Sequence, residues 1–385
     1  MPITKIDLTP VEVARAYATT TASLDGHANT GDGAGVARST FVLLRLEDDR
    51  GSVGFGEVSD VPQDRLADLA QLQQVLEQRL VGQDPEQIAL LTAPTGLDLD
   101  VRPDGTSYDL VSAAIDNALI DLAGRRVGLS SSALQGGRCR EHVWVSWVAF
   151  IRGLDDLEAE IAAKIDEGFT AFKLKVGLDR TLDRERVRLV RQLAGDDAHL
   201  KLDANSAWTV PDAVEFLRSL EKWRPDGVET PVAYRDVAGK AELRRTTGVP
   251  VIEHVHDVRF AVELLRADAI DVINTSTVGA GGSWRARTIL GLAEGFGLPC
   301  LLGSTVELGV GTAAQLHLAA SSPSVTWPSD LVGPLLYQDD IIDTPLTWTS
   351  GSLSVPTGPG LGVDIDPDKV ARLRTFVHDD QGGIG

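Results

Sequence analysis

The sequence predicts an α/β barrel that follows an N-terminal α+β unit. From about residue 142 to about residue 305, short apolar runs alternate with amphipathic helical segments. Parallel strands need such a crossover between them, and this many units in succession favour closure into a barrel. Residues 1–60 instead read as strands and residues 62–127 as helices, which is the order of an α+β unit. The alternative, an open doubly wound sheet, lacks its GxGxxG turn after an early strand.

The N-terminal unit begins with three expected strands and continues with three expected helices. The turn DDRG between the second and third strands predicts a hairpin. Residues 19–38, between the first two strands, are rich in Gly, Thr, Asp and Asn, and so long a loop in a compact domain is usually functional or disordered. The expected strands are 3–13, 39–48 and 52–58, and the expected helices are 65–82, 85–94 and 110–128.

The barrel region alternates expected strands with expected helices. Beyond residue 329, Pro- and Gly-rich hairpin-like segments are expected to return to the N-terminal unit or the barrel exterior. The expected domains are therefore 1–130, 131–328 and 329–385. The expected strands are 143–150, 170–177, 199–205, 227–230, 249–255, 271–279 and 298–305, and the expected helices include 154–168, 183–195, 210–223, 259–268 and 285–297.

Composition and charge exclude several classes of protein. The chain of 385 residues has a net charge of −20, and phosphate binding requires basic patches, so nucleic acid is not an expected partner. No run of about eighteen apolar residues is present, and no basic region followed by an apolar one opens the chain. We therefore expect a cytoplasmic protein without a membrane span. Cys139 and Cys300 lie far apart and read as two reduced thiols.

Three carboxylates each end a short apolar run: Asp203 in HLKLDAN, Glu229 in PDGVETP and Glu253 in VPVIEHV. The steps between them are 26 and 24 residues, about the length of one strand, one helix and two loops. Successive strand ends are neighbours in a parallel barrel, so the three side chains would converge. Such hard oxygen ligands suit Mg²⁺ or Mn²⁺ and not zinc. Each acid taken alone could also be an ordinary carboxylate that caps a loop. Asn205 would face the same way as Asp203 and could bond a ligand carboxylate or metal-bound water.

Two lysines precede the acids in TAFKLKVG. Side chains alternate along a strand, so Lys173 and Lys175 share one face, and they point into the barrel if Phe172 and Leu174 meet the helices. Two neighbouring cations lower each other's pKa, and partial desolvation acts in the same direction, so one lysine can serve as a general base. A divalent cation that chelates a substrate carboxylate would offset the charge of an enediolate while the lysine removes the α-proton. The alternative is a pair of solvated lysines at a strand edge.

Several motifs together resemble the enolase superfamily, and within it the muconate-lactonizing and mandelate-racemase-like enzymes. They are KLK, DAN, VETPV, GGSWRAR, GSTVELGVGTAAQLHLAAS, PTGPGLGVDID and the FGE that ends at Glu57, and the resemblance covers nearly the whole chain. It implies a modified (β/α)7β TIM-type barrel with an α+β capping domain, and Mg²⁺ at the strand ends. It also implies Lys175 as the direct base with Lys173 as its neighbour.

Three departures from the superfamily pattern bear on the reaction. Relatives often read Asp-Glu-Ser on the fifth barrel strand, where this chain has IEHV, so Glu253 is the expected third ligand and His254 the alternative. Muconate-type relatives often carry a lysine on the sixth strand, where the nearest residue here is Ser276, flanked by Thr275 and Thr277. The histidine that the racemase branch carries after the seventh strand is also absent from GLPCLLGSTVE.

The missing second base favours chemistry on one face of the substrate. We expect muconate-type syn cycloisomerisation, with dehydration of a hydroxy acid or sugar acid as the alternative. Racemisation or epimerisation is disfavoured, unless Ser276, Thr275 or His254 serves as a weak acid. Two other classes of protein compete with this interpretation: a barrel enzyme that acts on phosphates through metal-bound carboxylates, and a protein that binds a carboxylate or a metal without catalysis.

The remaining candidate residues would contact the substrate. Glu307 matches a position that often faces the active site in relatives. The alternative, which the sequence supports equally, is a carboxylate that caps the start of a helix. His27 belongs to the long early loop, which in this superfamily closes over the site, so His27, Asp25 and Asn29 are candidate specificity contacts; a polar loop with a stray histidine is the other interpretation. The resemblance also implies a small-molecule carboxylate as substrate and a homo-oligomer.

Overall fold

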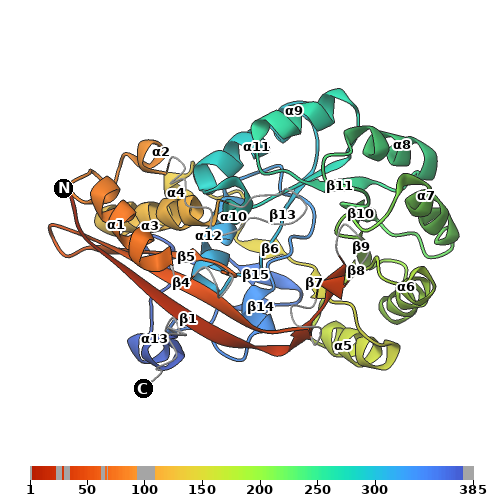
Figure 1. The fold of residues 1–385 in the computed structure, drawn as a ribbon, viewed down its shortest axis with the longest axis horizontal. Coiled ribbons are helices and arrows are strands. Elements are labelled where there is room, and N and C mark those ends of the chain that lie inside the picture. Colours follow the sequence, from red (N-terminus) through yellow and green to blue (C-terminus); the bar gives the residue numbers. More distant parts are fainter. Residues whose placement is uncertain are drawn as a thin grey trace, which may run out of the picture.

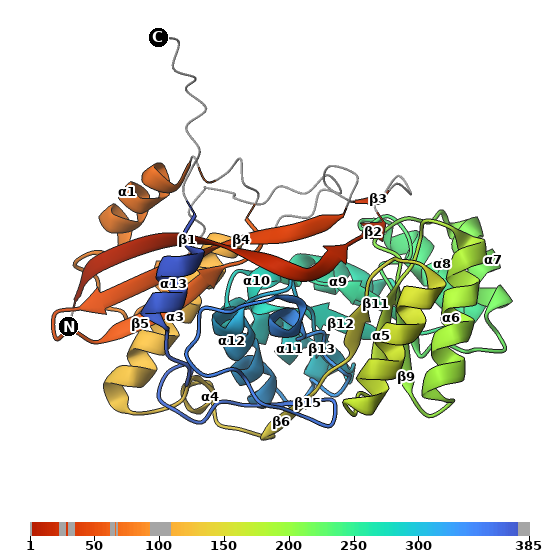
Figure 2. The ribbon, with the colours of Figure 1, turned by 90° about the horizontal axis from the view of Figure 1, so that it is seen from below.

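An α+β unit lies against one side of a barrel. This computed structural model describes residues 2–22, 28–29, 35–61, 66, 68–92 and 109–375. Strands β1 (Ile3–Thr19) and β4 (Val36–Asp48) of the N-terminal unit extend from that unit across the barrel, as Figures 1 and 2 show. Asp25 and His27, two of the expected specificity contacts, lie outside the described residues, as does the side chain of Asn29.

The main sheet of the N-terminal unit is antiparallel, in the order β1–β4–β5, with β5 at Val53–Val58. The central strand β4 is apolar on both faces because both faces are covered. Its Phe41 and Leu43 belong to the large core shared with the barrel, whereas Val42 and Leu44 belong to a separate core of the N-terminal unit. The three expected strands are confirmed, and two short strands pair beyond β1, namely β2 (Thr21–Ala22) and β3 (Ala28–Asn29).

Strand β5 is held close to a helix of the same unit. At Gly54 and Gly56 a Cβ atom would overlap the backbone carbonyl of Ala118 or Ala114, so glycine is what permits the close approach. The expected helix after residue 109 is confirmed, and its start is capped by Asp109, which accepts a hydrogen bond from Ser112 N at 3.2 Å. The helices are α1 (Leu69–Leu80), α2 (Ile88–Leu91) and α3 (Leu110–Val127).

Seven parallel strands, β7 to β13, pair in chain order in one sheet. The strands are β7 (Trp147–Ala149), β8 (Ala171–Lys175), β9 (His199–Asp203), β10 (Gly227–Glu229), β11 (Val251–His254), β12 (Val272–Thr275) and β13 (Cys300–Leu302). The helices between them are α5 (Leu154–Asp166), α6 (Arg180–Ala194), α7 (Val210–Ser219), α8 (Val237–Thr247), α9 (Val258–Arg266), α10 (Thr277–Ala280) and α11 (Ser283–Phe296).

The barrel is closed by residues 325–330, which follow helix α12 (Gly309–Ala320). This segment forms parallel bridges to both edges of the sheet, from Val325 to Cys300 and from Ser329 to Val145. Ser329 N donates to Trp144 O at 2.9 Å, and Asp330 N donates to Leu302 O at 2.8 Å. The eighth place in the ring is thus filled, and the expected (β/α)7β barrel is confirmed.

Alternation along the barrel strands separates two environments. Ile252, Val272 and Leu301 form a small cluster with Trp327 inside the barrel, whereas Val251 and Ile273 pack in the core between the strands and the helices. A residue two positions after an inward one also points inward. The position of a polar side chain along its strand therefore decides whether it faces the barrel interior or the helices.

The segment after the barrel returns along the N-terminal unit. Strand β15 (Ser352–Ser354) pairs with β6 (His142–Trp144) and with β14 (Trp348–Thr349), so the expected strand 143–150 is divided between this small sheet and the barrel. Arg374, after helix α13 (Pro367–Leu373), forms an antiparallel bridge with Val11 of β1. The short helices α4 (Ser131–Leu134) and η2 (Gly333–Leu336) complete the described elements.

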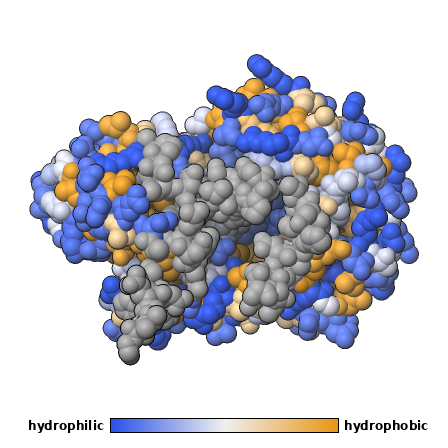
Figure 3. Space-filling model, in the orientation of Figure 1, coloured by the Kyte–Doolittle hydropathy of each residue, from blue (hydrophilic) through white to orange (hydrophobic). Residues whose placement is uncertain are grey.

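One face of the molecule is largely hydrophilic where its residues are described (Figure 3). On the face seen in Figure 3 hydrophilic residues predominate, and the hydrophobic ones are scattered in small groups. Within the described ranges, no helix combines the length and the hydropathy that a membrane crossing requires.

Candidate active site

Two lysines of β8 point into the barrel at its carboxyl end. Phe172 and Leu174, on the alternate positions, are fully buried in the core toward the helices, as the alternation predicts. Lys173 and Lys175 line a cavity of about 160 Å³ between the barrel and the N-terminal unit. The barrel contributes Ser304, Thr305, Val306 and Asp330 to its wall, and the N-terminal unit contributes Arg15, Thr19, Thr21, Val36 and Asp60.

Lys173 lies among three carboxylates. Its Nζ atom is 2.7 Å from Glu229 Oε1, 2.8 Å from Asp330 Oδ2 and 3.0 Å from Asp203 Oδ2. Burial disfavours the ammonium, but these three negative charges outweigh it and hold the pKa of Lys173 well above its ordinary value. The expectation that the neighbouring lysines lower each other's pKa is therefore wrong for Lys173, because the nearest charges are acidic.

Lys175 has fewer acidic neighbours than Lys173 and is slightly less buried. Its Nζ atom donates to Asp203 Oδ2 at 2.7 Å and to Asn205 Oδ1 at 3.1 Å. The backbone of Asn205 has a φ of 48°, a left-handed conformation that asparagine tolerates better than most residues, and Asn205 N donates to Asp203 Oδ1 at 3.0 Å. Asp203 and Asn205 together orient the Lys175 ammonium.

The two acids at the ends of β9 and β10 are fully buried. Burial opposes the ionisation of Asp203, but Lys173 and Lys175 hold its pKa well below the ordinary value. Burial also opposes the ionisation of Glu229, and Lys173 again lowers the pKa below the ordinary value. Both acids are therefore carboxylates at neutral pH.

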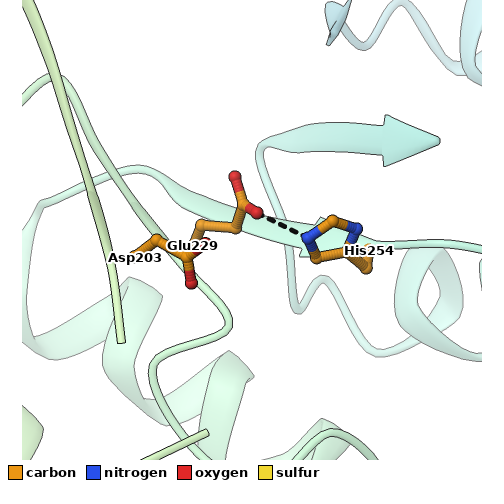
Figure 4. A group of neighbouring side chains, drawn as sticks. All are labelled: Asp203, Glu229 and His254. Carbon is orange, nitrogen blue, oxygen red and sulfur yellow. Dashed lines mark ion pairs between the residues drawn. The ribbon is translucent and has the colours of Figure 1, made fainter. Parts of the chain in front are cut away.

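The structure does not bring Glu253 to these two acids. Glu253 lies on the helix-facing side of β11, where its Oε2 atom is 2.9 Å from Lys240 Nζ of α8 and its Oε1 atom accepts a hydrogen bond from Thr230 Oγ1 at 2.7 Å. The alternative, His254, is the next residue and points inward. Its Nε2 atom lies 2.6 Å from Glu229 Oε1. Figure 4 marks this ion pair with a dashed line.

Asp203, Glu229 and His254 form a cluster that fits a divalent cation. One potential ligand atom from each lies within 4.8 Å of the other two. Glu229 Oε2 is buried and accepts no hydrogen bond from any described residue. A buried carboxylate oxygen without a partner is costly, and a cation would satisfy it. The two acids and the imidazole are the residues that would hold such a cofactor.

The chain matches two family models that together span most of its length. Residues 156–369 match the model described as "Enolase C-terminal domain-like", and residues 32–136 match "Mandelate racemase / muconate lactonizing enzyme, N-terminal domain". The first match alone covers more than half of the chain. The chain belongs to the enolase superfamily. The expected superfamily, its mandelate-racemase and muconate-lactonizing group, and the capped TIM-type barrel are confirmed, and so is the expectation of an enzyme.

Relatives in the superfamily carry names of different isomerases. Muconate cycloisomerase 1 of Rhodococcus opacus is 30% identical over 280 residues, which cover 72% of this chain and 75% of the relative. The N-succinyl-L-Arg/Lys racemase of Bacillus cereus is 29% identical over 346 residues, covering 87% of this chain and 90% of the relative. A solved 2-chloromuconate cycloisomerase from Rhodococcus opacus superposes with a TM-score of 0.86 at 27% identity, covering 98% of this chain and 100% of that one.

The other residues expected to contact the substrate mostly form hydrogen bonds within the folded chain instead. Ser276 caps the start of helix α10, where its Oγ atom accepts a hydrogen bond from Gly279 N at 2.8 Å. Glu307 is fully buried and accepts from Thr305 N at 2.9 Å and from Ser304 Oγ. Glu57, from the FGE motif, accepts from Leu308 N and Gly311 N at 2.9 Å each and so ties the capping unit to the start of α12.

Two residues of the site were not predicted from the sequence. Asp330 bridges Lys173 and Lys201, with its Oδ1 atom 2.8 Å from Lys201 Nζ. Arg15 lines the cavity and donates to Ser39 Oγ at 2.7 Å and to Thr19 Oγ1. Arg15 continues the alternation of Val11 and Val13, both of which belong to the core shared with the barrel. A charged residue in such a series is a signal that the sequence could have provided.

Proposed function

We propose that this protein is an isomerase that moves a proton at the carbon next to a substrate carboxylate, from one face only, in the manner of a muconate cycloisomerase. The observation that supports this proposal most directly is the asymmetry of the barrel end. Lys175 lines the cavity from β8, whereas β12, which lies four places away in the strand order, ends in Thr275 and is followed by Ser276. Neither hydroxyl titrates near neutral pH.

Lys175 is the group that would take or deliver the proton. A general base must lie within hydrogen-bond reach of the proton it removes, and Lys175 Nζ is held at the cavity wall by Asp203 and Asn205. Lys173 stays protonated among its carboxylates and supplies positive charge beside the reacting carbon. Arg15 adds a second permanent cation to the same wall, 3.4 Å from the carboxylate of Asp60.

A divalent cation bound by Asp203, Glu229 and His254 would hold the substrate carboxylate and offset the negative charge that develops as the α-proton leaves. The buried acids keep their charge because the lysines lower their pKa, so the ligand set stays ionised as metal binding requires. The same one-sided arrangement also suits syn elimination of water from a hydroxy acid, which is the second candidate reaction. The homo-oligomer and the cytoplasmic location stay predictions.

Proton exchange in D₂O tests the proposal. We would follow the α-proton by NMR for muconates, hydroxy acids and N-acylated amino acids, with each divalent cation in turn. Lys175→Ala should lower the exchange rate by about 10²–10⁴-fold, the usual contribution of a general base. Lys222→Ala, at an exposed lysine, is the matched control and should leave it unchanged.

The stereochemistry of the label separates the candidate reactions. Deuterium should enter the product on one face. Equal labelling of both product enantiomers would show a second base and would favour racemisation, the reaction named for the Bacillus cereus relative. Equal exchange rates in Lys175→Ala and the unmodified enzyme would exclude Lys175 as the proton carrier.

A further inference from the structure

The ligand set of the metal cluster differs in chemistry from the three carboxylates that the sequence suggests. Strand β11 ends in two polar residues, and alternation allows only one of them to face the barrel interior. Ile252 lies in the interior cluster, so His254, two residues later, points inward and Glu253 points to the helices. An imidazole therefore stands where a third carboxylate was expected.

Glu253 cannot readily exchange places with His254. Glu253 and Lys240 are both fully buried and form an ion pair of 2.9 Å. Lys240 Nζ also donates to Ala233 O at 2.8 Å and to Tyr234 O at 2.7 Å, so its position is fixed by the backbone. Turning Glu253 inward would leave a buried ammonium without its counter-charge, which is strongly unfavourable.

We propose that the cluster of Asp203, Glu229 and His254 binds a first-row transition-metal dication, represented by Mn²⁺, in preference to Mg²⁺. Imidazole nitrogen suits first-row transition metals, whereas Mg²⁺ favours an all-oxygen shell in near-ideal octahedral geometry. Mn²⁺ also accepts oxygen ligands and has the lowest affinity of these transition metals for mixed nitrogen and oxygen sites, so a preference for Mn²⁺ over Mg²⁺ is the strictest test of the effect of the imidazole. The inference deepens the proposed function and rests on it only in taking this cluster as the cofactor site.

The charge around the cluster also favours a transition-metal dication over Mg²⁺. Two carboxylates supply two negative charges, and Lys173 Nζ lies within 3.0 Å of both of them. A hard cation such as Mg²⁺ is held mainly by electrostatic attraction, so a neighbouring ammonium and a neutral third ligand weaken its binding. The bond from a transition metal to His254 Nε2 is less sensitive to that loss of charge.

Competition binding measures the preference without any substrate. We would load the metal-free full-length protein with Mn²⁺, detect bound Mn²⁺ by electron paramagnetic resonance, and titrate with Mg²⁺. His254→Asp restores a third carboxylate and should shift the ratio of the Mn²⁺ and Mg²⁺ affinities toward Mg²⁺. Even outer-sphere partners change metal affinity about 10- to 100-fold, so exchange of a direct ligand should shift this ratio by at least about tenfold.

A spectroscopic readout identifies the ligand directly. Pulsed electron paramagnetic resonance of the Mn²⁺-loaded protein should show coupling to one imidazole nitrogen, and the coupling should disappear in His254→Asp. The matched control is the paired change Glu253→Gln with Lys240→Met, which removes both buried charges and should retain the coupling and the affinity ratio. Circular dichroism spectra would confirm that each variant is folded.

Three outcomes would overturn the inference. One is an affinity ratio that is the same in His254→Asp and the unmodified protein; another is loss of Mn²⁺ binding in the Glu253 and Lys240 control while the fold is retained. The third is tighter binding of Mg²⁺ than of Mn²⁺ by the unmodified protein. None of these depends on turnover, so failure of the metal preference is distinguishable from failure of the proton-transfer proposal, which the D₂O exchange experiment tests separately.

Discussion

The buried pair of Glu253 and Lys240 offers a stability test of the geometry at β11. Removing one partner of a buried ion pair typically costs about 3–5 kcal/mol, because the other charge is left uncompensated. In Glu253→Ala, Lys240 Nζ would keep its two backbone carbonyl acceptors at 2.7 and 2.8 Å. We therefore expect a loss of about 3 kcal/mol in the free energy of unfolding, at the lower end of that range.

The combined variant Glu253→Gln with Lys240→Met should recover most of this loss. Burial raises the pKa of Glu253 above its ordinary value, although Lys240 and Thr230 act against that shift. The desolvation of the carboxylate is thus incompletely compensated, and replacing both charges removes that cost, since such pairs are often neutral on replacement. Methionine leaves Ala233 O and Tyr234 O without the Lys240 donor, so the combined variant is expected to be about 1 kcal/mol less stable than the unmodified protein.

Urea denaturation followed by tryptophan fluorescence measures both variants under the same conditions. The reasoning would be refuted if Glu253→Ala unfolded at the same urea concentration as the unmodified protein. It would also be refuted if Glu253→Ala kept its stability but lost Mn²⁺ binding, because Glu253 would then be a metal ligand and not the partner of Lys240.

Two further predictions concern the capping unit. Burial raises the pKa of Glu57 to about 8. Protonated Glu57 therefore contributes its full stabilisation of the folded state below the ordinary pKa of glutamate. That contribution, roughly 4–5 kcal/mol of the free energy of unfolding, is lost as the pH rises through 8. Glu57→Gln should flatten that loss in unfolding curves recorded from pH 5 to pH 8.5, and an unchanged pH dependence would contradict this origin. Gly56→Ala should lower stability by about 1–3 kcal/mol or more, because the new Cβ atom would overlap Ala114 O. Gly291→Ala in α11, where a Cβ atom meets nothing within 4 Å, is the control and should be neutral or stabilising in thermal melts.

The periodic features of the chain were readable from sequence because they depend on local spacing. The strand–helix alternation and the 24- and 26-residue steps predicted the parallel barrel, and the period of two placed Lys173 and Lys175 on one face. Asp203 and Glu229 converge for the same reason, since the ends of neighbouring parallel strands meet at one edge. These placements needed no knowledge of distant contacts.

The choice between Glu253 and His254 needed the tertiary structure. Val251 and Ile252 are both apolar, because a barrel strand is buried on its inner and outer faces, so the sequence pattern does not show which face is which. The pairing of Glu253 with Lys240, a residue of the preceding helix, decides the orientation, and the sequence contains no signal of that pair.

By itself, the sequence determined the superfamily, the barrel, the two lysines and two of the three residues of the candidate metal cluster. Only the folded chain decided the rest of the site: His254 as the inward residue of β11, Asp330 through closure of the barrel, and Arg15 through docking of the capping sheet. The physical reason is how far apart in the sequence the contacting residues lie. Periodicity reports which side chains share a face, whereas the partner that each face meets depends on contacts between residues far apart in the chain.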